Sequence, residues 1–157
     1  MEWHNLLVAA LVVVLGALLL SAGIEDARTR EIANAKNAAI ALLAPLWWSA
    51  MGMGWADVGI QLLIAGIVFA LFVGAFACGW MGGGDVKMIA ALALWLPLGR
   101  LLDMLMAMSI LGGAITVAMM IDRKWHRRVG AVEVPYGVAI AAASLLAIPQ
   151  MISRTGY

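Results

Sequence analysis

Charged residues are so widely spaced along this chain that they divide it into long apolar runs. Residues 1–24 contain only one charged side chain, Glu2. The runs that contain no charge cover residues 37–56, 58–84, 88–99, 104–121 and 134–153. Because the strands of a membrane barrel would alternate polar and apolar residues, continuous runs of this length favour helices. The pattern predicts six helices, the fourth either short or extended past Arg100 toward Leu102.

The composition decides which solvent these helices face. Of the 157 residues, 65% are hydrophobic and 12% are charged, and the mean hydropathy is +1.00. A soluble domain carries about 25% charged residues, so a water-soluble globular protein and a disordered chain are both excluded. One bilayer-spanning helix takes roughly 20 apolar residues, which leaves room for about six helices and no separate soluble domain. We therefore expect an all-α membrane protein, a polytopic bundle of about six transmembrane helices that forms a single domain over residues 1–157.

The basic residues fall unequally on the two sides of such a bundle. With six spans, alternate loops share a side, and one side receives eight of the ten Lys and Arg residues. These eight are Arg28, Arg30, Lys36, Lys87, Arg123, Lys124, Arg127 and Arg128. Because cytoplasmic loops carry the excess of Lys and Arg, both termini are predicted to face outward. The tryptophans expected in an aromatic belt on the outer side are Trp3, Trp47, Trp48, Trp55 and Trp95.

Three consecutive glycines interrupt the apolar sequence just before a carboxylate. Residues 80–87 read Trp-Met-Gly-Gly-Gly-Asp-Val-Lys. Glycines are poor helix formers and can adopt a positive φ, so we expect a helix break at 82–84, where another backbone approaches closely. Asp85 follows at the predicted start of the fourth span, where a helix N-terminus favours a negative charge. An ionisable residue at such a place indicates a functional site, although a tight turn capped by Asp85 gives the same pattern.

A second carboxylate is predicted at the same end of the bundle. Asp26 lies where the first span ends, in the charged segment 25–34, which is otherwise typical of a solvated juxtamembrane loop. The alternation of spans puts Asp26 and Asp85 at the same depth on the cytoplasmic side. Two carboxylates held together cannot both ionise easily, so one keeps a proton. Such a pair can polarise a water for attack on a peptide carbonyl and then protonate the leaving amine, without a metal.

Three motifs in this order resemble those of the type IV prepilin leader peptidases, aspartyl proteases of the Gly-x-Gly-Asp membrane class. Residues 26–34 are similar to the family pattern Asp-x-Arg…Ile-Pro-Asn, with Ala33 in place of the proline. Residues 82–87 are similar to Gly-x-Gly-Asp-x-Lys. Residues 134–140 are similar to the Pro-Tyr-Gly-Pro-Ala that opens the family's last span, with Val138 in place of the second proline. The order and spacing of the three motifs extend over most of the chain, from about residue 23 to residue 143.

The resemblance implies a role for each candidate site residue. Asp26 and Asp85 would be the catalytic pair, and Gly82, Gly84 and Lys87 would shape the loop around the second aspartate. The substrate would be a prepilin whose basic leader is cut at the cytoplasmic face of the bacterial inner membrane, and no metal or cofactor is expected. The acidic residues expected to hold that leader, unless they only balance nearby arginines, are Glu25, Glu31, Asp122 and Glu133.

The length of the chain narrows the resemblance further. Larger members of the family carry an added cytoplasmic loop with Cys-x-x-Cys pairs and also methylate the new N-terminus. This chain has one cysteine, Cys78, so it resembles the small peptidases of the tight-adherence (Flp) pilus systems. A small proton- or ion-coupled transporter and a non-catalytic pilus-assembly protein stay open as alternatives, although transporter sites tend to lie near the midplane. The net charge of +1 argues against nucleic acid as a partner and leaves membrane lipid as the surroundings.

Overall fold

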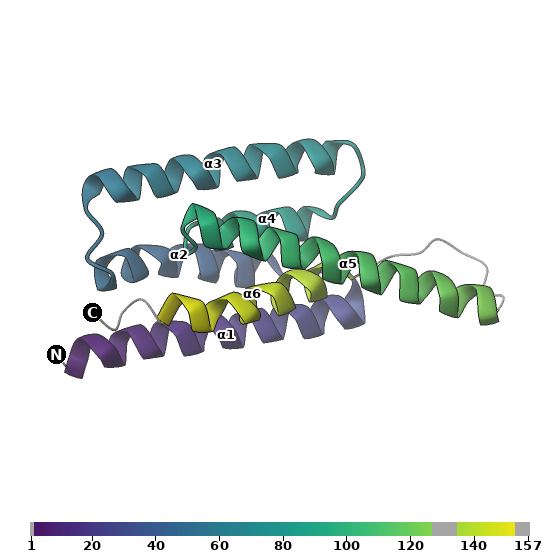
Figure 1. Cartoon of the computed structure of the whole chain (residues 1–157), viewed down its shortest axis with the longest axis horizontal. Coiled ribbons are helices and arrows are strands. Elements are labelled where there is room, and N and C mark those ends of the chain that lie inside the picture. Colours follow the sequence, from purple (N-terminus) through teal and green to yellow (C-terminus); the bar gives the residue numbers. More distant parts are fainter. Residues whose placement is uncertain (1, 127–134, 153–157) are drawn as a thin grey trace.

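The computed structural model describes residues 2–126 and 135–152, which form six helices and no strand (Figure 1). The helices are α1 (Glu2–Thr29), α2 (Asn34–Ala50), α3 (Trp55–Ala77), α4 (Gly83–Ala93), α5 (Leu98–His126) and α6 (Tyr136–Ile152). By length and composition, α1, α3 and α5 are able to cross a membrane. The predicted fold class, a helical bundle of a membrane protein, is confirmed.

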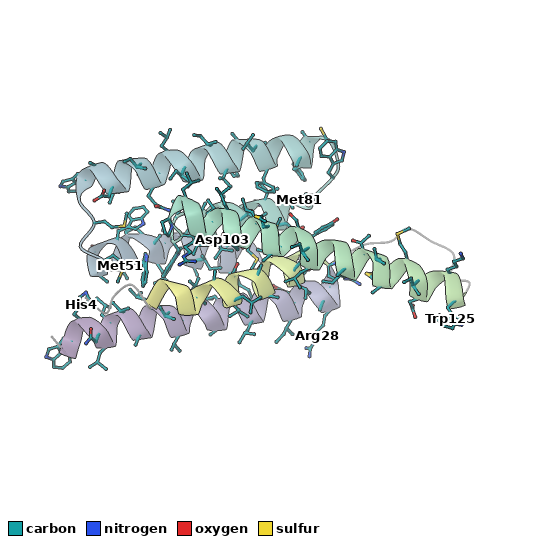
Figure 2. The ribbon with its side chains drawn as sticks, viewed as in Figure 1. His4, Arg28, Met51, Met81, Asp103 and Trp125 are labelled. Carbon is teal, nitrogen blue, oxygen red and sulfur yellow. The ribbon has the colours of Figure 1, made fainter. Side chains whose placement is uncertain are left out.

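The two ends of the bundle are built from alternating helix ends. At one end, called the site end below, α1 and α3 stop and α2, α4 and α6 begin (Figure 1). His4 and Met51 lie at the opposite end, where Nε2 of His4 is 2.6 Å from the carbonyl oxygen of Ala50 (Figure 2). α5 extends beyond the other helices, and Trp125 near its end is exposed (Figure 2).

α1 is longer than the apolar run that predicts it. It continues through Glu25 and Asp26 to Thr29, so Asp26 stands on a helix and not in the loop that follows. The helix ends because Arg30 adopts a positive φ of 59°, and the Arg30 N–H donates to the carbonyl oxygen of Asp26 at 3.0 Å. A left-handed residue after the last turn is a common way to end a helix. Helical geometry therefore sets the direction of the Asp26 side chain.

The helix break expected at 82–84 lies earlier, at residues 78–82, and Gly83 and Gly84 already belong to α4. α3 ends at Ala77, and Gly79 has a φ of +74°, which glycine adopts without the steric cost other residues meet. α4 then begins at Gly83 and ends at Ala93. Arg100 belongs to α5, so the predicted alternative in which the fourth helix continues toward Leu102 is wrong. Pro97 accounts for the separation, because a proline removes a backbone N–H and disfavours helix in the residue before it.

The turn between α4 and α5 is closed by side chains from two other helices. The indole N–H of Trp48 donates to the carbonyl oxygen of Leu94 at 2.7 Å. The side-chain amide of Gln61, itself buried, donates to the carbonyl oxygens of Ala93 at 2.5 Å and Leu96 at 2.7 Å. The last carbonyl groups of a helix need such partners when water is excluded. α4 can therefore end inside the protein.

α4 forms the centre of the bundle, and α3 lies at its edge. α4 packs against α2, α3, α5 and α6, and side chains such as Met88, Ile89 and Leu92 are fully buried. α3 packs chiefly on α4 and leaves large apolar side chains exposed, including Leu63 and Leu71 at 63% and 68%. A broad exposed apolar surface of this kind is what a helix presents to lipid.

The predicted aromatic belt is only partly right. Trp3 and Trp55 are 84% and 94% exposed, as a belt at the membrane surface requires. Trp47 and Trp95 are buried instead, with ring centroids 5.5 Å apart, and the indole N–H of Trp95 donates to the carbonyl oxygen of Ile40 at 2.8 Å. These two tryptophans face each other across the interior, so the prediction is wrong for them.

Candidate active site

Asp26 projects from the end of α1 toward the first turn of α6. Its side chain is buried, with 4% of the residue exposed. The backbone N–H of Val138 donates to Oδ2 of Asp26 at 3.1 Å, and the backbone of Gly137 also hydrogen-bonds to this carboxyl group. The unpaired N–H groups at the start of a helix attract negative charge. A carboxyl group carried by α1 is therefore held in place by α6.

The contact between α1 and α6 requires a glycine at position 137. A Cβ atom there would lie 2.8 Å from Cγ and Oδ2 of Asp26, and 2.7 Å from Cδ1 of Ile32. Packed side chains do not approach this closely without displacement. Gly137 is the glycine of the Pro-Tyr-Gly motif, whose role the sequence alone leaves open. The structure shows that it admits the Asp26 carboxyl group against the α6 backbone.

Asp85 stands in the first turn of α4, directly after the glycines, and is 9% exposed. Ile32, from the link between α1 and α2, packs on Gly84, where a Cβ atom would lie 3.3 Å from Cβ of Ile32. The side-chain amide of Asn37 donates to the carbonyl oxygen of Gly84 at 3.1 Å. The glycines thus let the α1–α2 link approach the start of α4, which brings the elements that carry the two aspartates together.

Two adjoining pockets at the site end are lined by both aspartates. The smaller has a volume of about 240 Å³ and is bounded by Ile32 and the three glycines. The larger has a volume of about 660 Å³ and extends to Trp80 and Tyr136. The residues that line both pockets are Asp26, Arg30, Glu31, Gly82 and Asp85. A peptide bond in the region common to the pockets would have a carboxyl group from each of two helices beside it.

The surroundings of Asp85 favour its protonated form. Burial, and after it the negative charge of Asp26, raise the pKa of the Asp85 carboxyl from the ordinary 3.8 to about 6. A hydrogen bond from the backbone of Gly82 opposes this rise. A carboxyl group that is withdrawn from water and beside another negative charge is costly to ionise. Asp85 therefore keeps its proton at a pH where an isolated aspartate has lost it.

The other residues that the sequence singles out at this end differ in their contacts. Glu31 is exposed and lines both pockets. Lys87 lines neither, and its Nζ donates to Oδ1 of Asn34 at 2.8 Å. Glu25 also lines neither, because its carboxylate forms an ion pair with Lys36 at 3.0 Å. Of the acidic residues expected near the leader that the structure describes, Glu31 is thus the one that lines the pockets of the aspartates.

Of the remaining acidic candidates, Asp122 lines neither pocket. Asp122 is exposed near the end of α5, and Glu133 lies outside the described residues. Across residues 2–126 and 135–152, no group of three or more His, Cys, Asp or Glu side chains is arranged to hold a metal ion.

Asn37 and the backbone of α6 are parts of the site that sequence reasoning missed. Asn37 is 4% exposed and supports Gly84, and its signal was a polar side chain at the start of an otherwise apolar run. The N–H groups of Gly137 and Val138 carry no side-chain signal. Only the neighbouring Pro-Tyr-Gly motif marked their position.

The comparisons with known proteins identify one family. The model of the type IV leader peptidase family matches residues 13–117 of the 157, about two thirds of the chain. The match includes Asp26, the three glycines and Asp85, and it ends before α6. The searches of curated proteins and of solved structures give no match.

Proposed function

The chain belongs to the type IV leader peptidase family, and from this premise we propose that it cleaves prepilins as an aspartic endopeptidase with Asp26 and Asp85 as its catalytic pair. Family membership itself makes the protein a protease that acts on prepilin leaders. The observation that carries the aspartic mechanism is that two buried carboxyl groups, from α1 and α4, line the same pockets. Among the described residues of those pockets none is a serine or a cysteine, and the hydroxyl group of Thr29 donates to the carbonyl oxygens of Glu25 and Glu31. These contacts favour water as the nucleophile.

In the proposed reaction Asp85 starts protonated and Asp26 starts ionised. Main-chain N–H groups donate hydrogen bonds to Asp26, and such bonds stabilise the ionised form of a carboxyl group. Water gives a proton to Asp26 as its oxygen attacks the scissile carbonyl carbon, and Asp85 gives its proton to the carbonyl oxygen. When the C–N bond of the tetrahedral intermediate breaks, Asp26 protonates the leaving amine and one hydroxyl proton returns to Asp85. Both carboxyl groups then have their starting charge.

The proposed place of action is the cytoplasmic face of the bacterial inner membrane. Basic residues at the site end support this orientation: Arg28 near the end of α1, Lys36 in the first turn of α2 and Lys87 near the start of α4. Cytoplasmic segments carry the excess of Lys and Arg in membrane proteins. A prepilin would then present its leader from the cytoplasm and its apolar segment from the bilayer.

The proposed substrate is a precursor of a Flp-type pilin. The chain has a single cysteine, so the Cys-x-x-Cys pairs that accompany methylation in larger members of the family have no counterpart here. Incubation with the precursor and a methyl donor tests this assignment, because the new N-terminus is expected to appear unmethylated in the mass spectrum of the product.

Co-expression with a candidate prepilin tests the catalytic pair. Asp26→Asn and Asp85→Asn keep the size of each side chain, and each is expected to lower cleavage by about 10³-fold, the scale of a lost acid or base. Asp103→Asn is the matched control, because this exposed aspartate contacts Arg100 at 3.5 Å on α5, far along the chain from either carboxyl group. Cleavage at the wild-type rate in either of the first two variants, with the protein present in the membrane, removes that residue from the mechanism.

A further inference from the structure

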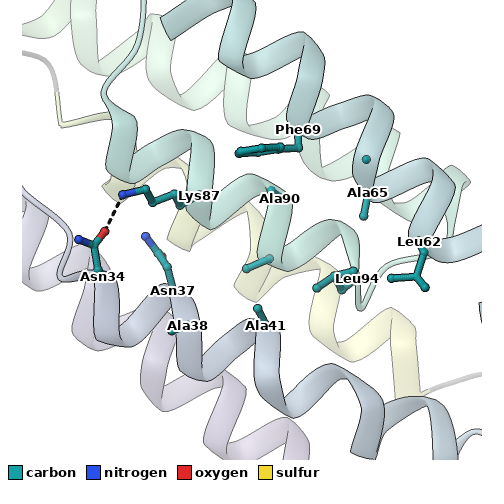
Figure 3. Close-up of a pocket in the computed structure, with 12 residues that line it drawn as sticks. Asn34, Asn37, Ala38, Ala41, Leu62, Ala65, Phe69, Lys87, Ala90 and Leu94 are labelled. Atoms are coloured by element: carbon teal, nitrogen blue, oxygen red, sulfur yellow. Dashed lines mark hydrogen bonds between the residues drawn. The ribbon is translucent and has the colours of Figure 1, made fainter.

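An apolar groove lies between α2, α3 and α4 (Figure 3). α3 packs on α4 but hardly touches α2, although α2 and α3 are consecutive in the chain. The groove between the three helices has a volume of about 560 Å³. Small residues form much of its wall: Ala38 and Ala41 on α2, Ala65 and Gly66 on α3, and Ala90 on α4. Such walls leave room for the side chains of an incoming segment.

Asn37 lines the groove, and half of its side-chain amide has no partner. The residue is 4% exposed, and its Nδ2 donates to the carbonyl oxygen of Gly84. Its Oδ1 is buried and accepts no hydrogen bond from any residue that the structure describes. A buried acceptor left unpaired costs about 1–3 kcal/mol, and native proteins leave few of them. The Oδ1 atom therefore indicates a hydrogen-bond donor that arrives with a ligand.

One residue, Asn34, lines both the groove and the smaller pocket of the two aspartates. Its Oδ1 accepts a hydrogen bond from Nζ of Lys87, so this pair lies where the groove and that pocket meet (Figure 3). A polypeptide whose scissile bond lies beside the aspartates would pass Asn34 to reach the groove. On the other side of the aspartates, the larger pocket offers polar side chains such as Thr29 and Glu31. The two spaces match a substrate that changes from polar to apolar at the cut.

We propose that the groove binds the first helical turn of the apolar segment that follows the scissile bond, with Oδ1 of Asn37 accepting one of its main-chain N–H groups. The inference rests on the proposed function, which supplies the substrate. The first N–H groups of a helix have no acceptor within the helix, so the start of an apolar helix brings the donor that Asn37 lacks.

The size of the groove suits this occupant. A helical turn has a pitch of about 5.4 Å and a diameter of about 10–12 Å, and so fills roughly 500 Å³. The groove, at about 560 Å³, accommodates one such turn, and the rest of the substrate helix lies in the lipid beside α3. Its small wall residues then decide which side chains can follow the cut, which makes the groove a specificity site.

Disulfide cross-linking in the full-length protein, in lipid nanodiscs, tests the location directly. Cys78 is exposed and is first replaced by serine. Ala90→Cys then puts a thiol in the groove, and Ala70→Cys puts one on the exposed face of α3 as the matched control. A prepilin with a single cysteine in the first turn after the cut is expected to cross-link at least tenfold more with Ala90→Cys. Equal yields, no yield with Ala90→Cys, or a disulfide between two copies of the enzyme overturns the proposal.

Kinetics with two substrates separate substrate binding from a purely structural effect. Ala41→Leu narrows the groove and is expected to raise KM for the full precursor about tenfold. A short peptide that spans the cut but lacks the apolar segment is expected to be cleaved as by the wild type. Asn37→Ala removes the donor to Gly84 as well as Oδ1, so it is expected to lower kcat for both substrates and, in addition, to raise KM for the full precursor alone. A fall in kcat that is equal for both substrates, with KM for the full precursor unchanged, contradicts the proposed contact of Oδ1.

Failure of this proposal is distinguishable from failure of the proposed function. If the precursor is still cut in Asp26→Asn or Asp85→Asn, the aspartic mechanism fails whatever the groove variants do. If both aspartates are required but Ala41→Leu and Ala90→Cys behave like the corresponding changes at Ala70, the groove proposal alone is wrong. The groove then holds lipid.

Discussion

Asp26 and Asp85 are both buried, but the protein holds them in different ways. Asp26 comes from a long helix, and its carboxyl group is bound by main-chain N–H groups of α6, a helix that packs along α1. Asp85 comes from an 11-residue helix whose first two residues are Gly83 and Gly84, and its carboxyl group accepts a hydrogen bond from the main chain of Gly82, three residues earlier. One carboxyl group is fixed by contact between distant segments, and the other by its own local turn.

This difference predicts how well the position of each carboxyl group withstands substitutions of the residues around it. A group clamped between two helices depends on their close packing, so a small steric change at the clamp moves it. A group in the first turn of a helix that begins with glycines sits in backbone that can adjust, because glycine has the widest range of allowed φ and ψ angles. We therefore expect substitutions near Asp26 to do more damage than equivalent substitutions near Asp85.

Gly137→Ala should have the largest effect. The added methyl group would meet Asp26 and Ile32 at under 3 Å, so either α6 or the carboxyl group must move. We expect cleavage to fall by about 10²-fold or more, the cost of misplacing a catalytic group by about 1 Å. The overpacked contact should also lower the free energy of unfolding by about 1–3 kcal/mol.

The matched control for this substitution is Gly113→Ala on α5, where a Cβ atom would meet nothing within 4 Å. It should keep full activity and gain up to about 1 kcal/mol of stability from helix propensity. Both quantities are read from a prepilin cleavage assay and from thermal unfolding in detergent. Wild-type cleavage by Gly137→Ala would show that the clamp at Asp26 is not required.

Gly84→Ala should have a smaller effect on the other carboxyl group. The new Cβ atom would lie 3.3 Å from Cβ of Ile32, so the α1–α2 link has to yield by only a few tenths of an ångström. We expect cleavage to fall by about tenfold, roughly 1.4 kcal/mol in the barrier. Gly74→Ala on α3, with no atom within 4 Å of its Cβ position, is the control. A loss as large as that of Gly137→Ala would remove the contrast between the two aspartates.

The pH dependence of Asp85 tests whether the two carboxyl groups sense each other. Infrared spectra of the protein should show the Asp85 carboxylic acid band disappearing near pH 6 in the wild type. In Asp26→Asn the negative charge that helps raise the pKa of Asp85 is gone, so the band should disappear at lower pH. An unchanged midpoint in that variant would contradict the coupling.

The same pKa predicts how stability changes with pH. The pKa of Asp85 is raised in the folded state, so its proton stabilises the fold fully below about pH 3.8, and this stabilisation is lost as the pH rises through about 6. In Asp85→Asn the side chain at this position is an amide, which does not ionise between pH 4 and 6. The thermal stability of the wild type should therefore fall relative to that of Asp85→Asn between pH 4 and 6, and parallel curves would contradict the expectation.

Ala33→Pro should have the smallest effect, although it restores the proline of the family pattern. Ala33 has a φ of −58°, which proline also adopts, but its N–H donates to Oε2 of Glu25 at 3.0 Å. The gain from a stiffer unfolded chain and the loss of one hydrogen bond should nearly cancel, within about 1 kcal/mol in the free energy of unfolding. Unfolding and cleavage assays beside Glu25→Gln, which weakens the same bond, would reveal any larger effect.

The number of helices and the shared end of the two aspartates could be predicted from the sequence. Charged residues are rare enough to mark the ends of the helices. Because consecutive spans run in opposite directions, the end of the first span and the start of the fourth lie on the same side. The buried faces could not be predicted, because these helices are apolar all round and show no periodic stripe. Trp47 and Trp95 illustrate this limit: their position near span ends indicated a belt, whereas their neighbours in space bury them.

The support of the candidate site was equally hidden. Asp26 and Gly137 are more than a hundred residues apart, and their contact depends on how closely α1 and α6 pack. Gly137 has no side chain of its own to suggest a role, and the N–H of Val138 belongs to the backbone. The sequence motifs therefore indicated which segment belongs to the site beside Asp26. The contact between this segment and the Asp26 carboxyl group is visible only in the folded structure.

The buried turn after α4 has a consequence for the membrane itself. At about 1.5 Å per residue, the 11 residues of α4 cover roughly half of a hydrocarbon layer about 30 Å thick. Where α4 stops, donors from Trp48 and Gln61 take the place of solvent on the carbonyl oxygens, so no water is needed there. A helix that stops at half depth can in this way keep the hydrocarbon dry around its last turn.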